Sequence, residues 1–335
     1  MPGASARVGG WFREKAGNSW LASQLDKWGV GETEPGSCAP LTGNGEDVSN
    51  RFGDLLGRAE KGENVLPKNA GEFIYLQVGG IFTEHYPGYM AGNNERLQKS
   101  GVEAQQVPID TDAGVTENAK AIRDYVLAAT KKAGKKAVLT GHSKGGVDIG
   151  AAMSLYPELK AAVHAVVSMN APIKGSQIAQ DFKDNSLGDK AASGVIKNVF
   201  RGDPEALRDL TYERREAFNT AHPYPQDVST VSMAGSSDNE HSSGMMPLVA
   251  HIRAQAGKPS DGMVAPSDAV LPGSDVVRVN DIDHAEGAMK GMSGVGAHDP
   301  GSIQLAMVTL ALERAERDKK RKEGAKTAGA PEARK

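Results

Sequence analysis

The sequence predicts an α/β fold with a mostly parallel central sheet and helices on both faces. Three observations predict it. Apolar runs of strand length recur from residue 72 onward, segments with helical spacing separate them, and a glycine-flanked serine follows one of the runs. Parallel strands need such crossover connections, and helices on both faces bury the sheet. The 335 residues are enough for one large core.

The expected elements follow in order from a first clear strand at residues 72–78, which β-branched and aromatic residues dominate. Apolar spacing of three and four residues marks the helices between the strands. A polar, largely helical insertion occupies about residues 176–226. The later strands are expected at residues 102–109, 136–140, 162–169, 228–233 and 276–279, and the helices at 91–100, 116–133, 146–156 and 301–322.

Charge and composition exclude several classes of partner. The formal net charge is −3 at pH 7, so no global attraction to nucleic acid or to an anionic membrane acts on the chain. Cys38 is the only cysteine, so no intrachain disulfide forms, which fits a reducing compartment. The N-terminus has no apolar run of signal-peptide length, and no stretch of the sequence approaches the length of a membrane span. We therefore expect a cytoplasmic protein, and export without such a signal is the alternative.

The segment Gly141-His142-Ser143-Lys144-Gly145 joins the strand at 136–140 to the helix at 146–156. A serine on such a sharp strand-to-helix turn has strained backbone angles and an exposed hydroxyl, and its flanking positions tolerate little beyond glycine. The pattern predicts that Ser143 is a nucleophile, and an ordinary serine at a helix start is the alternative. A serine nucleophile needs a base and a group that orients that base.

Loops at the carboxyl ends of later strands supply candidates for both partners. His284 lies a few residues past the strand at 276–279, where a base can reach back to Ser143. Asp238 and Asp261 both follow the penultimate strand. We favour Asp261, which stands in the local sequence Ser-Asp-Gly-Met-Val, and Asp238 is the alternative. A buried carboxylate would fix the imidazole tautomer that accepts the serine proton.

Two backbone amides are expected to hold the negative oxygen of a tetrahedral intermediate. One is the amide of Lys144, directly after the nucleophile. The other comes from the loop after the first strand, where the paired glycines Gly79 and Gly80 let the backbone approach a substrate. We favour the amide of Ile81, with Phe82 as the second choice.

These residues resemble the α/β-hydrolase superfamily, and within it the lipase-like branch. The order Ser143, Asp261, His284 is the superfamily's nucleophile, acid, base order. Segments at 78–90, 141–146, 210–215 and 283–285 also resemble a set of little-characterised plant and bacterial hydrolase-like proteins. The resemblance implies the α/β-hydrolase fold with the insertion as a helical cap, and an acyl-enzyme mechanism. We expect no cofactor and no metal. The resemblance leaves one alternative, a structural calcium near the histidine loop with Glu286 and Asp238 as ligands.

Three parts are expected along the chain: an N-terminal extension (residues 1–70), an α/β-hydrolase catalytic domain (71–318) and a disordered basic tail (319–335). The extension carries every tryptophan. Leu21, Leu25 and Trp28 in it have the spacing of an amphipathic helix. We expect this helix to pack across the catalytic domain, and peripheral contact with lipid is the alternative.

The sequence thus predicts a lipase- or esterase-like serine hydrolase that cleaves carboxylic esters, with a small-molecule ester or a lipid as substrate. Two alternatives stay open. One is a catalytically silent α/β-hydrolase fold that serves as a binding module, and the other is a lipid-directed effector hydrolase such as a phospholipase. Acyl-chain length, head group and oligomeric state do not follow from the sequence.

Overall fold

The computed structural model describes residues 40–81, 83, 86, 88–183, 204–237, 259–289 and 298–328. In these residues the sheet has six strands in the order β2-β1-β3-β4-β5-β6. Every neighbouring pair is parallel. This confirms the predicted fold class. The strands are β1 Phe73–Val78, β2 Glu103–Gln106, β3 Lys136–His142, β4 Val163–Met169, β5 Thr230–Gly235 and β6 Asp275–Val279.

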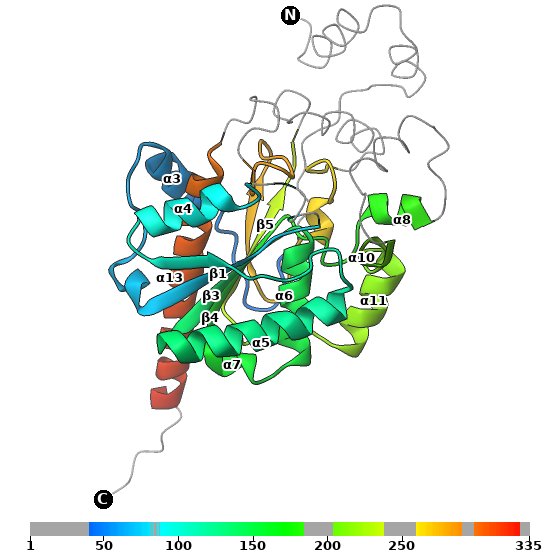
Figure 1. Cartoon of the computed structure of the whole chain (residues 1–335). Coiled ribbons are helices and arrows are strands. Elements are labelled where there is room, and N and C mark those ends of the chain that lie inside the picture. Colours follow the sequence, from blue (N-terminus) through cyan, green and yellow to red (C-terminus); the bar gives the residue numbers. More distant parts are fainter. Residues whose placement is uncertain are drawn as a thin grey trace, which may run out of the picture.

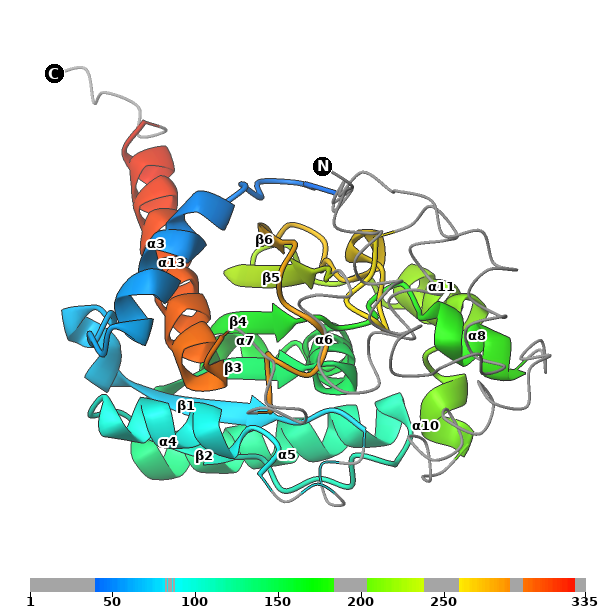
Figure 2. The same ribbon diagram turned by 90° about the horizontal axis from the view of Figure 1, so that it is seen from above.

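Helices cover both faces of the sheet, as Figures 1 and 2 show from two directions. One layer holds α3 (Ser49–Glu60), α4 (Ala91–Lys99) and α13 (Pro300–Ala328), and the other holds α5 (Val115–Ala133), α6 (Lys144–Leu155) and α7 (Leu159–Ala162). Two short 3₁₀ helices, η1 (Lys68–Glu72) and η3 (Pro266–Asp268), complete the described elements outside the insertion. Among the described residues, no helix combines the length and apolar character that a membrane span requires.

Side chains along β1 alternate between the two cores. Phe73 and Tyr75 join the cluster beneath α3, α4 and α13, whereas Ile74, Leu76 and Val78 join the cluster beneath α5, α6 and α7. Successive side chains of a strand point to opposite faces, and here both faces are covered. All six residues of β1 are therefore buried, which explains why the strand is apolar in the sequence except at Gln77.

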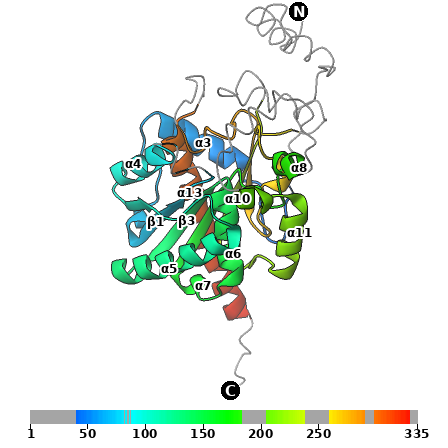
Figure 3. The same cartoon turned by 45° about the vertical axis from the view of Figure 1, so that its right-hand side comes forward.

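The described part of the insertion contains three helices. Figure 3 shows its helices α8 (Gln177–Lys183), α10 (Pro204–Arg208) and α11 (Tyr212–Ala221) grouped on one side of the molecule, near α6. Residues 184–203 of the insertion lie outside the described residues.

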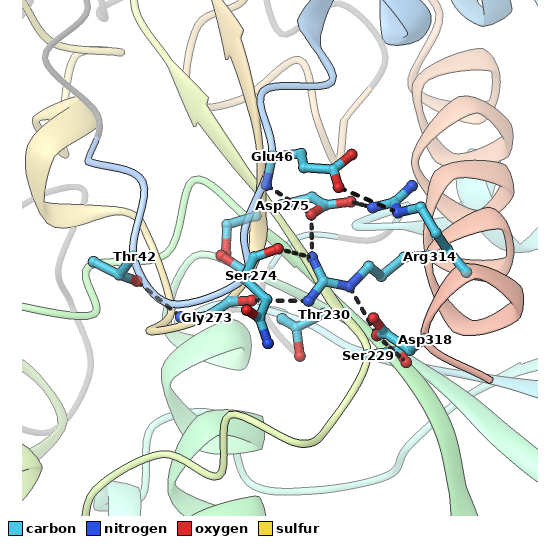
Figure 4. Close-up of polar contacts among 12 residues, drawn as sticks. Thr42, Glu46, Ser229, Thr230, Gly273, Ser274, Asp275, Arg314 and Asp318 are labelled. Atoms are coloured by element: carbon cyan, nitrogen blue, oxygen red, sulfur yellow. Dashed lines mark hydrogen bonds and ion pairs between the residues drawn. The ribbon is translucent and has the colours of Figure 1, made fainter. Parts of the chain in front are cut away.

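A buried ion network fixes the last helix to the edge of the sheet (Figure 4). The guanidinium of Arg314 on α13 is 2% exposed and pairs with Asp275 at the start of β6. Its Nε also donates to Asp318 at 2.8 Å. The backbone amide of Glu46 donates to the same Asp275 carboxylate at 2.9 Å. Because unpaired buried charges are costly, these contacts fix residues 40–47 and α13 to β6.

Both expected ends of the catalytic domain differ from the structure. Helix α3 buries Phe52 and Leu55 in the core that α13 covers, so the packed unit begins before residue 71. Helix α13 continues to Ala328, so the segment after residue 318 begins as helix rather than as a disordered tail. Ion pairs support this extension, among them Arg321 to Glu46 at 2.6 Å. The tryptophan-bearing residues 1–39 and residues 329–335 lie outside the described residues.

Candidate active site

Ser143 occupies the turn between β3 and α6 with φ of 55° and ψ of −129°. Residues other than glycine rarely adopt such angles, and the strain persists only where the surroundings enforce it. The amide of Ser143 donates to the carbonyl of Met169 at 2.9 Å, which ties the turn to β4. The residue is partly exposed.

Close backbone packing explains the glycines on both sides of Ser143. A Cβ on Gly141 would lie 2.5 Å from the amide nitrogen of Gly146. A Cβ on Gly145 would lie 2.3 Å from the carbonyl oxygen of Val78 at the end of β1. Both distances are too short for real atoms, so the start of α6 can cross the strand ends only with glycine at these positions.

The structure brings Ser143, His284 and Asp261 together from three separate loops. His284 Nε2 lies 2.9 Å from Ser143 Oγ, and His284 Nδ1 lies 2.7 Å from Asp261 Oδ2. A carboxylate only accepts, so Nδ1 carries a proton and donates it, which leaves Nε2 to accept from the serine hydroxyl. The backbone amide of His284 also donates to the Asp261 carbonyl, at 2.8 Å. The arrangement can take a proton from Ser143 when its oxygen attacks a substrate.

A local turn orients the carboxylate of Asp261. Its Oδ1 accepts from the amides of Met263 at 2.8 Å and Val264 at 2.7 Å. Those bonds occupy one oxygen and direct the other to His284. The side chain is 1% exposed, so few water molecules compete for it. The Asp-Gly-Met-Val sequence therefore forms the turn that presents Asp261, and the alternative acid Asp238 lies outside the described residues.

The pKa of His284 reflects two opposing influences. Burial is the largest and lowers the pKa, because it disfavours the imidazolium. The charge and hydrogen bond of Asp261, with the nearby charge of Asp283, outweigh burial and raise the pKa above 6.5. The site therefore favours the imidazolium, the form that His284 would take after accepting a serine proton.

The glycine loop after β1 lies directly against Ser143. A Cβ on Gly80 would come within 2.8 Å of the Ser143 Cβ, so only a glycine allows this approach. The Gly80 carbonyl accepts from Thr83 Oγ1 at 2.8 Å, which orients its peptide group. Ile81 follows at once and is partly buried, whereas Phe82 lies outside the described residues. Lys144 begins α6, so its amide lies at a helix N-terminus.

The side chain of Lys144 has a role that the sequence analysis missed. Its Nζ lies 2.9 Å from Asp148 Oδ2, and both side chains are fully buried. Asn118 on α5 donates to the same oxygen at 3.1 Å. Burial raises the pKa of Asp148, and the charge of Lys144 opposes the rise. The four-residue spacing of a cation and a carboxylate in the sequence was the available signal for this pair.

The described residues contain no group of three or more His, Cys, Asp or Glu arranged to hold a metal ion. Glu286, close to His284 in sequence, instead accepts from the backbone amides of Asp283 at 2.9 Å and His298 at 3.3 Å. A cavity of about 540 Å³ lies between α6, α11 and the loop after η3, and its described lining includes neither Ser143 nor His284.

Comparison with known proteins shows which solved structures share this fold. No family model and no curated protein matches the chain. The metagenomic carboxyl esterase MGS0156 superposes with a TM-score of 0.65 at 23% identity, over 88% of this chain and 99% of that one. The mature Bacillus licheniformis lipase BlEst2 gives 0.53 at 20%, over 65% and 86%. EstA from Clostridium botulinum gives 0.53 at 14%, over 86% and 97%. The chain thus has the α/β-hydrolase fold, which confirms the fold that the resemblance implied.

Proposed function

We propose that the protein is a serine hydrolase that cleaves carboxylic esters through an acyl-enzyme. One observation carries the proposal: Asp261, His284 and Ser143 are linked by contacts of 2.7 and 2.9 Å, with the serine on a strained turn. A serine that merely began a helix would need neither the strain nor a buried imidazole and carboxylate in line with its hydroxyl.

In acylation, Ser143 Oγ attacks the ester carbonyl carbon while His284 Nε2 accepts the hydroxyl proton. Asp261 keeps the imidazole in the accepting tautomer and stabilises the imidazolium. When the tetrahedral intermediate collapses, the C–O bond to the alcohol breaks and His284 Nε2–H protonates the leaving oxygen. A water molecule, deprotonated by the same nitrogen, then attacks the acyl-enzyme and releases the acid.

The negative oxygen of each tetrahedral intermediate is held by the amides of Ile81 and Lys144. The Lys144 amide adjoins the nucleophile at the N-terminus of α6, where the helix dipole favours negative charge. The close approach of Gly80 to Ser143 supports the choice of the next amide, that of Ile81. Each such donor is worth about 3 kcal/mol of transition-state stabilisation.

The substrate class rests on the site and on the structural neighbours, which are named as a carboxyl esterase and a lipase. A site with one nucleophile, one base and backbone donors suits an uncharged acyl group and needs no cofactor. The helical insertion at residues 176–226 follows β4 and is proposed to act as the cap over the acyl chain. The length of acyl chain that fits under this cap can be measured.

Hydrolysis of p-nitrophenyl esters from acetyl to palmitoyl tests the proposal. The wild-type protein should release nitrophenol, whereas Ser143→Ala and His284→Ala should each lose about 10⁴-fold or more in kcat. Ser154→Ala is a matched control, because Ser154 lies on α6, the helix that follows Ser143, and within the described part of the chain its hydroxyl donates to the Gly150 carbonyl at 2.9 Å. Equal turnover by wild type and Ser143→Ala would refute the proposal.

A further inference from the structure

His142, beside the proposed nucleophile, is buried at 1% exposure and takes no part in the chemistry proposed above. Its Nε2 lies 2.8 Å from the backbone carbonyl oxygen of His284. Its Nδ1 lies 2.5 Å from the hydroxyl of Tyr89. A carbonyl oxygen only accepts, so Nε2 carries the proton and Nδ1 accepts from the tyrosine hydroxyl. One neutral tautomer satisfies both contacts.

The neutral form of His142 is strongly favoured. Burial, with a smaller effect from the charge of His284, lowers the pKa of His142 to about 3. Near neutral pH the ring therefore stays uncharged. The direction of both hydrogen bonds is then constant over the range in which His284 gains and loses its proton.

The hydroxyl of Tyr89 connects this ring to the glycine loop. A Cβ on Gly80 would lie 2.5 Å from Tyr89 Oη and 2.8 Å from the Cβ of Ser143, so Gly80 lies between the phenol and the nucleophile. The backbone of Gly80 also opposes the burial-induced rise in the pKa of Tyr89, in keeping with this proximity. One hydroxyl therefore contacts both the loop that carries Ile81 and the ring that holds the His284 backbone.

Two further hydrogen bonds join the chain at the end of the glycine loop and the start of α4 to the loop of His284. The amide of Met90 donates to the carbonyl of Ala288 at 2.8 Å. Asn93 Nδ2 donates to the carbonyl of Gly287 at 2.9 Å. The chain that follows the glycine loop and the loop of His284 are thus held together by these two bonds in addition to the contacts of Tyr89 and His142.

We propose that Tyr89 and His142 are positioning residues, which together hold the glycine loop and the His284 loop at a fixed separation around Ser143. The proposal rests on the proposed function, because it concerns the same site. Tyr89 Oη acts on the loop that bears the Ile81 amide, and His142 Nε2 acts on the backbone of the proposed base.

This separation matters because proton transfer and oxyanion binding both depend on small distances. The imidazole must reach Ser143 Oγ and the leaving oxygen, while the amides must reach the carbonyl oxygen of the same substrate. A loop shift of a fraction of an ångström reduces stabilisation of the transition state more than it reduces substrate affinity. Removal of the Tyr89 hydroxyl is therefore expected to lower kcat with little change in KM.

The test compares Tyr89→Phe with Tyr75→Phe. Both tyrosines are buried in the same core cluster, at 7% and 1% exposure. Tyr75 is the matched control because, among the described residues, its hydroxyl donates to the Ala70 carbonyl at 2.8 Å and not to a group of the site. We expect about a tenfold fall in kcat for Tyr89→Phe, with KM within about twofold of wild type. Tyr75→Phe should keep the wild-type kcat.

A second pair of variants keeps the proposal testable should the first pair differ in stability. In His142→Gln the new side-chain amide can still donate to the His284 carbonyl, whereas His142→Leu leaves no donor at this position. His142→Gln should therefore retain several times the kcat of His142→Leu, at temperatures where both remain folded by circular dichroism. Loss of kcat only in proportion to loss of folded protein would overturn the proposal.

The outcomes separate the two proposals. Wild type active on the ester panel, with Tyr89→Phe and Tyr75→Phe equal in kcat, overturns the positioning role and leaves the hydrolase intact. Wild type inactive on every ester, and unlabelled by a fluorophosphonate, overturns the proposed function and the positioning role with it. A selective fall in kcat for Tyr89→Phe supports both.

Discussion

Replacing Asp261 by asparagine probes the most specific feature of the site. The asparagine Oδ1 can still accept from the amides of Met263 and Val264, which now lie 2.8 and 2.7 Å from the carboxylate. The turn therefore survives. The amide nitrogen of the new side chain then faces His284 Nδ1, which must accept, so that the proton moves to Nε2. In that tautomer the imidazole can no longer accept from Ser143.

The structure indicates different magnitudes for activity and stability. Loss of the accepting tautomer lowers kcat by about 10⁴, or about 5 kcal/mol. Stability falls much less, by about 1–2 kcal/mol, because both turn hydrogen bonds remain but become bonds to a neutral acceptor.

Initial rates on a p-nitrophenyl ester and urea unfolding measure the two quantities. Asp268→Asn is the matched control, because Asp268 lies in the same segment and accepts from the Tyr212 hydroxyl at 3.0 Å instead of from His284. A kcat for Asp261→Asn within about tenfold of wild type would refute the reasoning. It would favour the alternative acid, Asp238.

Three further predictions follow. The kcat/KM should rise with pH through a His284 pKa above 6.5, because only neutral imidazole accepts the serine proton, and Asp261→Asn should lower that inflection, since burial would then dominate; a pH profile that is flat from 5 to 9 would contradict this. Gly80→Ala, whose new Cβ would lie 2.8 Å from the Ser143 Cβ, should lower kcat by about 100-fold. Gly71→Ala, whose new Cβ would meet nothing within 4 Å, should leave kcat unchanged. Equal rates for Gly80→Ala and Gly71→Ala would be evidence against the role of the glycine loop. Hydrogen bonds to Asp281 and Glu60 outweigh burial and raise the pKa of His298 to about 9. Its stabilisation should therefore be complete below pH 6.5 and lost as pH rises through about 9, so urea midpoints of wild type should fall over that range and those of His298→Gln should not.

Sequence periodicity predicted a central strand of the sheet and one of the helices that cover it. The expected strand at 136–140 and the helix at 116–133 agree with β3 and α5 within two residues at each end. The expected strand at 102–109 is shortened to Glu103–Gln106, because β2 is an edge strand that pairs only with β1 in the described sheet. Edge pairing depends on where the neighbouring chain ends, which a local pattern does not reveal.

The sequence predicted a candidate site residue where the neighbouring residues in the chain determine its position. Ser143 lies between glycines that the backbone crossing requires, and Asp261 lies in a turn whose amides orient it. The contacts of Tyr89 and His142 were not predictable in the same way. They join segments 53 and 142 residues apart, and only the folded chain brings them together.

The domain boundaries illustrate the same limit. Polar composition before residue 71 hid the apolar face of α3, where Phe52, Leu55 and Leu56 point into the core. The basic segment after residue 318 continues α13 partly because Arg321 pairs with Glu46, a partner from the opposite end of the chain. Composition alone describes a segment in isolation, whereas its partners decide whether it folds.

Labelling by a fluorophosphonate tests the central claim most directly. The probe phosphonylates a serine only where a base activates the hydroxyl and an oxyanion site holds the phosphoryl oxygen. Peptide mapping by mass spectrometry should find one adduct per chain, on Ser143, and no adduct in Ser143→Ala or after heat denaturation. A native protein that stays unlabelled, or that carries its adduct on another serine, would contradict the assignment of Ser143, His284 and Asp261 as a hydrolytic site.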